Sequence, residues 1–73
     1  MSAKDEAEAE RARVLMVARK ASEILERARE ELVELAGEAR ETGLDAPIAS
    51  ARLTLSNFAI GIVRDAGEIV NKR

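Results

Sequence analysis

An uncharged stretch at residues 53–63 most constrains what this chain can fold into. It reads Leu-Thr-Leu-Ser-Asn-Phe-Ala-Ile-Gly-Ile-Val, in a protein in which 36% of the residues are charged. At about 100° per residue, the apolar side chains of a helix around this stretch form two stripes. Such a helix needs two sets of neighbours, and one short chain can supply only one set. We therefore predict that the chain is a subunit of a homo-oligomer.

The two stripes predict two different contacts for the second half of the chain. The first stripe is expected to pack within the chain, against the preceding helix, and contains Ile48, Leu55, Phe58, Ile62 and Ile69. The second stripe lies further round the helix. It is expected to form the interface between subunits, and contains Leu53, Ser56, Ile60, Val63, Gly67 and Val70.

The length and composition leave few ways to stabilise a monomer. A domain of 73 residues lies in the range where a single core rarely suffices. Cysteine and histidine are both absent, which excludes disulfides and the usual zinc sites. Asp and Glu are not spaced in any loop that would hold a hard cation. We therefore expect no cofactor and no metal, and self-association remains as the route to stability.

The first half of the chain predicts one long helix over residues 3–42. Ser2 and Asp5 have the spacing of a capping box, and Ala, Glu, Arg and Leu predominate, all strong helix formers. A heptad-like series of apolar positions follows and is expected to face the second helix. It contains Val14, Ala18, Ala21, Leu25, Ala28, Leu32 and Leu35.

A helix stop and a helix restart follow within a few residues. Gly43 is suited to a left-handed C-terminal cap, Asp45 to an N-cap, and Pro47 to the first turn of a helix over residues 46–71. The short connection predicts an antiparallel two-helix hairpin. The fold class is thus all-α, with residues 1–73 as a single helical-hairpin domain. Residues 1–13 form a charged helical overhang, because the second helix is too short to cover them.

The remaining side of the second helix is polar, small and uncharged over its first turns. It contains Ser50, Thr54, Asn57 and Gly61. We interpret these residues as lining a close helix contact or a narrow lumen, with Asn57 fixing register or subunit number. The alternative is an ordinary exposed face that lacks charge.

The chain contains no motif for catalysis or ligand binding. No His can serve as a base and no Cys as a nucleophile. The glycines match no phosphate loop, and the one aromatic residue, Phe58, lies on an apolar stripe. The start of the chain lacks the pattern of a signal peptide, and residues 53–63 are too short to cross a bilayer. We predict a cytoplasmic protein that is not an enzyme. Its partner is a copy of itself, with no small molecule, nucleic acid or membrane.

In style, the chain resembles computationally designed helical oligomers. The resemblance lies in the cap Ser2/Asp5, the stop Thr42-Gly43-Leu44 and the restart Asp45-Ala46-Pro47. It implies rings or cages whose function is assembly itself. Two other hypotheses remain open. One is a natural helical-hairpin adaptor that binds another protein's helix. The other is a small RNA-binding hairpin dimer like the plasmid copy-number regulators.

Overall fold

The computed structural model describes residues 2–72, and these residues form three helices and no strand. The helices are α1 (Ala3–Glu34), α2 (Ala36–Thr42) and α3 (Asp45–Lys72). The predicted all-α class is therefore confirmed. Residue 1, which the predicted overhang includes, lies outside the described residues.

The cap at the start of α1 has the predicted geometry. The backbone N–H of Asp5 donates to Oγ of Ser2 at 3.3 Å, which satisfies one of the N–H groups that a helix start leaves unpaired. Asp5 and Glu6 lie in the first turn, where negative charge is favourable because the helix dipole is positive there.

The prediction of one unbroken helix over residues 3–42 is wrong at Leu35. This residue has φ −84° and ψ 1° and separates α1 from α2. Its N–H donates to the carbonyl of Leu32 at 3.2 Å, which is the tighter i→i−3 pattern. Two features weaken the helix here. The last turn of α1 has acids but no basic residue, which is unfavourable at a helix C-terminus, and Gly37 follows with low helix propensity.

The turn between α2 and α3 depends on Gly43, as predicted. Gly43 has φ 79°, in the left-handed region that glycine adopts without strain. The N–H of Leu44 donates to the carbonyl of Ala39 at 2.8 Å. Asp45 was predicted to precede the second helix as its N-cap, but α3 begins at Asp45 itself. The carbonyl of Leu44 accepts the first helical bond, from Ile48 N–H at 3.0 Å.

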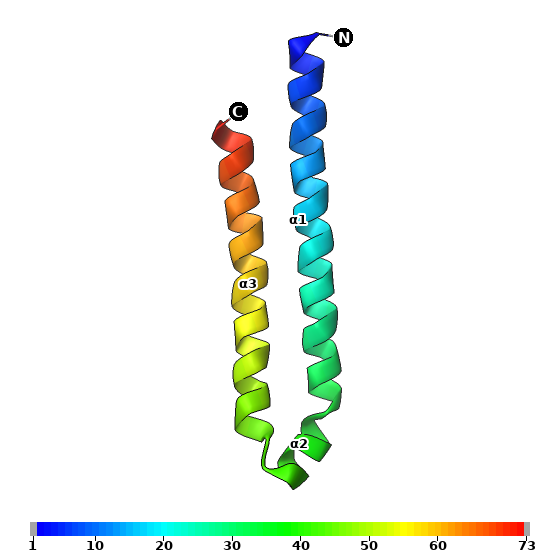
Figure 1. Ribbon diagram of the computed structural model, residues 1–73, viewed down its shortest axis with the longest axis vertical. Coiled ribbons are helices and arrows are strands. Elements are labelled where there is room, and N and C mark those ends of the chain that lie inside the picture. Colours follow the sequence, from blue (N-terminus) through cyan, green and yellow to red (C-terminus); the bar gives the residue numbers. More distant parts are fainter. Residues whose placement is uncertain (1, 73) are drawn as a thin grey trace.

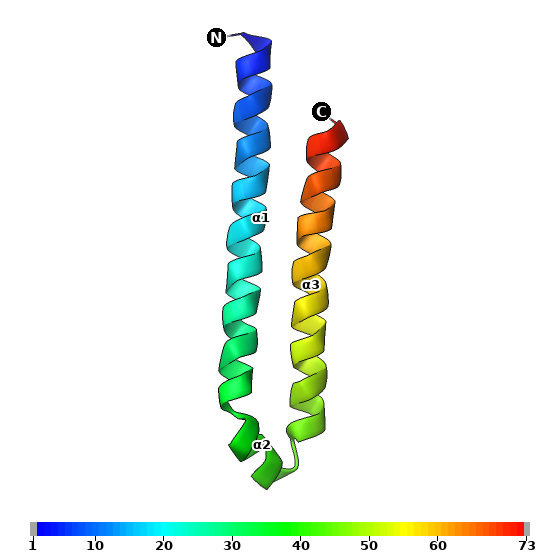
Figure 2. The same cartoon turned by 180° about the vertical axis from the view of Figure 1, so that it is seen from behind.

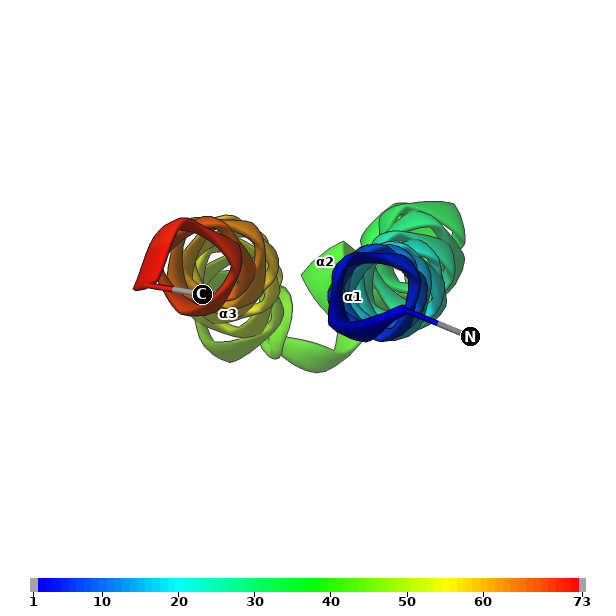
Figure 3. The same cartoon turned by 90° about the horizontal axis from the view of Figure 1, so that it is seen from above.

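Helices α1 and α3 run side by side in opposite directions, joined by α2 (Figures 1 and 2). The view along the helices shows two adjacent rods with α2 bridging them at the far end (Figure 3). The Cα atoms extend 60 × 17 × 8 Å, so the chain forms a slab one helix thick. The N-terminal turns of α1 extend past the end of α3 (Figure 1).

Only alanines are buried in the described part of the slab. Among residues 2–72, the buried hydrophobic residues are Ala18, Ala39, Ala59 and Ala66. Every large apolar side chain in this range keeps part of its surface in solvent. Two helices in one layer contact each other along one line, so each larger side chain can be covered on one side only.

Candidate interaction surface

The line along which α3 contacts α1 runs between the two stripes predicted from the sequence. Ala59 and Ala66 are the buried residues of α3, and Ala59 belonged to neither set of predicted contacts. Small side chains allow the two helix axes to approach closely, so α3 turns these alanines toward α1 and places its larger residues on both flanks.

The predicted set of intra-chain contacts on α3 is therefore divided. Ile48, Leu55 and Ile62 are half-buried, as expected for residues beside the contact line. Phe58 is 58% exposed and Ile69 is 44% exposed. The structure does not place Phe58 in the contact between the helices, whereas Ile69 borders that contact together with Val14 and Ala66. The physical reason is the rotation of α3 that places Ala59 at the contact.

On α1 the predicted contact positions lie near α3, with one exception. Ala18 is buried, and the half-buried positions are Val14, Ala21, Leu25, Ala28 and Leu32. The exception is Leu35, which is exposed because it lies in the break between α1 and α2.

The residues predicted to form the subunit interface fall into two groups. Leu53, Ile60 and Val63 are exposed by 64%, 65% and 55%. Ser56, Gly67 and Val70 are half-buried. Ser56 faces α1, since its Oγ accepts a hydrogen bond from Nη1 of Arg29 at 3.1 Å. The exposed group forms one apolar flank of α3, while Ser56 contributes to contacts within the chain.

The small polar side of α3 lies on the edge of the slab away from α1. Ser50, Thr54 and Asn57 are exposed and Gly61 is half-buried. The hydroxyl of Thr54 donates to the carbonyl of Ser50 at 3.0 Å, one turn earlier. Threonines within helices often form this bond. A Cβ added to Gly61 would meet only Nη2 of Arg64, at 3.8 Å. Among residues 2–72, no backbone of another helix approaches Gly61 closely.

The slab has two apolar faces, which we name face A and face B. The faces follow from the helical spacing of exposed side chains on either side of the contact line. Face A consists of Leu15 and Val33 of α1 with Leu53, Ile60 and Val63 of α3. Face B consists of Val17 and Ile24 of α1 with Phe58, Ile62 and Ile69 of α3.

Sequence reasoning missed the contribution of α1 to face A. Leu15 is 48% exposed. The single apolar stripe that was predicted for this helix did not include it. The signal was present in the apolar run at residues 14–18. A continuous run of five apolar residues covers more of a helix's circumference than one partner helix can shield.

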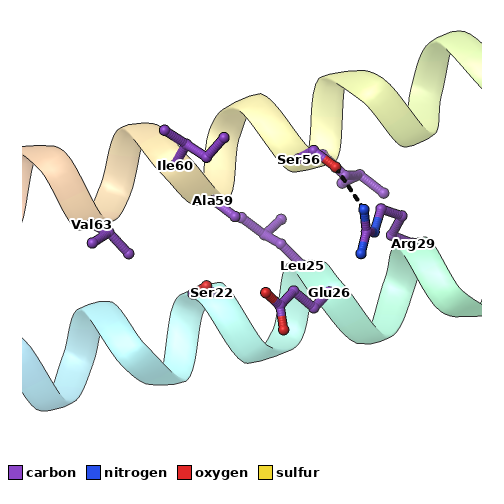
Figure 4. A pocket seen from close by; sticks show the side chains of 9 residues that line it. Ser22, Leu25, Glu26, Arg29, Ser56, Ala59, Ile60 and Val63 are labelled. Atoms are coloured by element: carbon purple, nitrogen blue, oxygen red, sulfur yellow. Dashed lines mark hydrogen bonds between the residues drawn. The ribbon is translucent and has the colours of Figure 1, made fainter.

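Each face contains an open hollow between α1 and α3. The hollow on face A has a volume of 390 Å³. Figure 4 shows the side chains that surround it, from Ser22 and Leu25 on α1 to Ala59, Ile60 and Val63 on α3. The hollow on face B has a volume of 440 Å³ and lies nearer the chain termini, between Val14 and Val17 of α1 and Ile69 of α3. Both hollows are mainly apolar.

Most charged side chains in the described part of the chain are exposed. Within residues 2–72, no group of three or more acidic, His or Cys side chains could hold a metal ion. Nε of Arg64 and Oδ1 of Asp65 lie 3.5 Å apart on an exposed surface. Ion pairs in such positions contribute little to stability.

Helix α3 is long and apolar enough, by length and composition, to cross a membrane. Only 6% of the apolar segment in question is buried within the structure. The sequence expectation considered residues 53–63 alone, whereas the full helix is 28 residues long. The apolar surface of α3 is thus both extensive and uncovered.

Comparison with known proteins gives no match. No protein-family model, no curated protein and no solved structure matches the chain.

Proposed function

We propose that the chain is a structural subunit: a helical hairpin that associates with copies of itself and catalyses no reaction. The observation that supports this proposal is the contrast between what the chain buries and what it exposes. Within the described residues it buries four alanines, while Leu53, Ile60 and Phe58 are each more than half exposed. A chain with this distribution gains most of its apolar burial only when another molecule covers it.

The energy available from such covering is comparable with the net stability of a single domain, about 5–15 kcal/mol. Full burial of one large aliphatic or aromatic side chain stabilises by roughly 1.5–3 kcal/mol. The five residues of face A are each at least 44% exposed. Covering them contributes several kcal/mol per subunit before the cost of association, about 4–15 kcal/mol, is subtracted. Covering both faces therefore favours assembly more strongly than covering one.

A copy of the chain is a better occupant than a different protein. An adaptor would expose both apolar faces whenever its partner was absent, and apolar patches of this kind promote aggregation. Copies are always present at the concentration of the chain itself. An RNA-binding dimer is less well supported, because nucleic-acid surfaces are basic and this chain has a formal net charge of −2.

Light scattering coupled to size-exclusion chromatography tests the proposal directly. We expect one discrete mass equal to several chains, with helical content and mass both retained at micromolar concentration. A well-ordered monomer of 7.9 kDa would refute self-assembly. A monomer that aggregates would favour a missing protein partner.

Flotation with neutral phosphatidylcholine vesicles separates assembly from membrane insertion of α3. We expect the protein to remain with the soluble fraction. Co-flotation of most of the protein, with increased helicity, would assign the exposed surface of α3 to lipid and would also contradict the proposal.

A further inference from the structure

The slab exposes apolar side chains on both faces, and this limits the kinds of assembly that can cover it. A single two-fold contact is isologous and buries the same patch of both partners. It would cover face A or face B and leave the other in solvent. Side chains more than half exposed are present on both, with Ile60 on face A and Phe58 on face B. The following inference rests on the proposed function.

The register between α1 and α3 determines which of their residues lie at the same position along the helix axes. We call this position the height of a residue. Arg29 and Ser56 are joined by a hydrogen bond, Leu25 and Ala59 line the same hollow, and Ala18 and Ala66 line another. In these pairs the residue number rises along α3 as it falls along α1, as expected for antiparallel helices.

The largest side chain of face B lies at the height of the hollow on face A. The α3 residues that line this hollow run from Leu55 to Val63, and Phe58 is within that span on the opposite face. The residues that line the hollow include the small residues Ser22, Ser56 and Ala59 (Figure 4). A copy placed beside the slab without a shift along the helices would bring Phe58 onto this hollow.

A second match lies nearer the chain termini, between the hollow on face B and a side chain of face A. The α1 residues that line the hollow on face B run from Glu10 to Ala18, and Leu15 of face A is within that span. Leu15 is 48% exposed and would meet this hollow in the same unshifted arrangement. A single contact between face A and face B therefore places a large side chain against a hollow at two positions along the helices. Phe58 meets the hollow on face A, and Leu15 meets the hollow on face B.

The two edges of the slab differ in a way that indicates which helix lies inside. The edge formed by the back of α1 contains charged residues such as Lys20, Arg27 and Glu34, all exposed. The back of α3 begins with the small uncharged residues Ser50, Thr54 and Asn57. A charged edge is suited to bulk solvent, and a small polar edge to a narrow, wet interior.

We propose that copies of the chain close into a ring of three or more subunits, with face A of each packed on face B of the next. Rotation about an axis parallel to the helices involves no shift along them, so side chains at equal heights meet. In this ring α3 lies inside and α1 outside. Ser50, Thr54 and Asn57 line a polar lumen. Both faces of every subunit are covered, which no two-chain assembly with a single interface achieves.

Cysteine cross-linking tests the contact, because the chain has no cysteine of its own. Val63→Cys places a thiol on face A, and Asp65→Cys places one on face B at nearly the same height. Each variant alone is expected to form no disulfide dimer on oxidation, whereas the two variants refolded together form one. The double variant is expected to give a ladder of linked chains that ends at the mass of the native oligomer.

A matched control uses the outer edge of the ring. Lys20→Cys lies near the height of Val63 but on the back of α1, where Lys20 is exposed, so refolding it with Val63→Cys should give no dimer. Rapid dimerisation of either face variant alone would indicate an isologous contact and overturn the ring. So would the absence of cross-links from the mixture, provided that circular dichroism and light scattering show native helicity and mass.

The unmodified chain provides a second readout that is independent of folding defects in the variants. Light scattering should give a single mass of three or more chains that stays constant across the micromolar range. A monomer would refute self-assembly, and the ring with it. A stable two-chain mass would overturn the ring alone and leave the proposed self-assembly intact.

Discussion

Truncation of Ile60 provides a sharp test of whether apolar exposure drives assembly. Full burial of an isoleucine side chain contributes roughly 1.5–3 kcal/mol, and Ile60 is 65% exposed in the single chain. Assembly would therefore add about 1–2 kcal/mol per subunit at this position. Ile60→Ala should weaken each subunit contact by about 5- to 30-fold, since 1.4 kcal/mol corresponds to a factor of ten.

The assay is light scattering over a dilution series, together with thermal unfolding by circular dichroism at each concentration. For Ile60→Ala we expect dissociation at a higher concentration than for the wild type, and a larger fall in Tm on dilution. Met16→Ala is a matched control. Met16 is 52% exposed but lies on the back of α1, where truncation should change stability by less than about 0.5 kcal/mol. Equal effects of the two variants, or no effect of Ile60→Ala, would refute the reasoning.

Three further substitutions test other parts of the structure. Ala66→Leu adds bulk at a position that is 5% exposed; it should lower the free energy of unfolding by about 1–3 kcal/mol, as measured by urea titration. Gly43→Ala imposes strain at φ 79° and should cost about 1 kcal/mol, seen as a lower Tm. Gly67→Ala fills open space in the single chain and should raise helicity, with a gain of about 0.5–1 kcal/mol. A loss of oligomer mass in Gly67→Ala would instead indicate that a neighbouring subunit approaches this glycine closely.

Local features of the chain were predictable because they depend on a few neighbouring residues. Ser2 caps α1, and Gly43 ends α2 in the left-handed conformation. Both outcomes are determined by backbone hydrogen bonding and steric limits within one turn of the helix. The break at Leu35 was not predicted. The residues around it are strong helix formers, and the low helix propensity of one glycine does not offset their combined preference. There the acids in the last turn of α1 and the nearby Gly37 act together.

The candidate surface was only partly predictable. The sequence indicated that α3 has more apolar circumference than one helix can cover, and Leu53, Ile60 and Val63 are indeed exposed. Periodicity could not determine how α3 is rotated about its own axis. It assigned Phe58 to the core between the helices, whereas the structure exposes it.

By itself, then, the sequence determined the all-α class, the cap at Ser2, the turn at Gly43 and the excess of apolar surface on the second half of the chain. Only the tertiary structure decided that the contact line follows Ala18, Ala59 and Ala66, and therefore that a large apolar residue lies on each flank. The physical reason is that helical periodicity defines which residues share a side. The rotation that brings one side against its neighbour depends on how closely two particular surfaces can approach, and small residues far apart in the sequence set that distance.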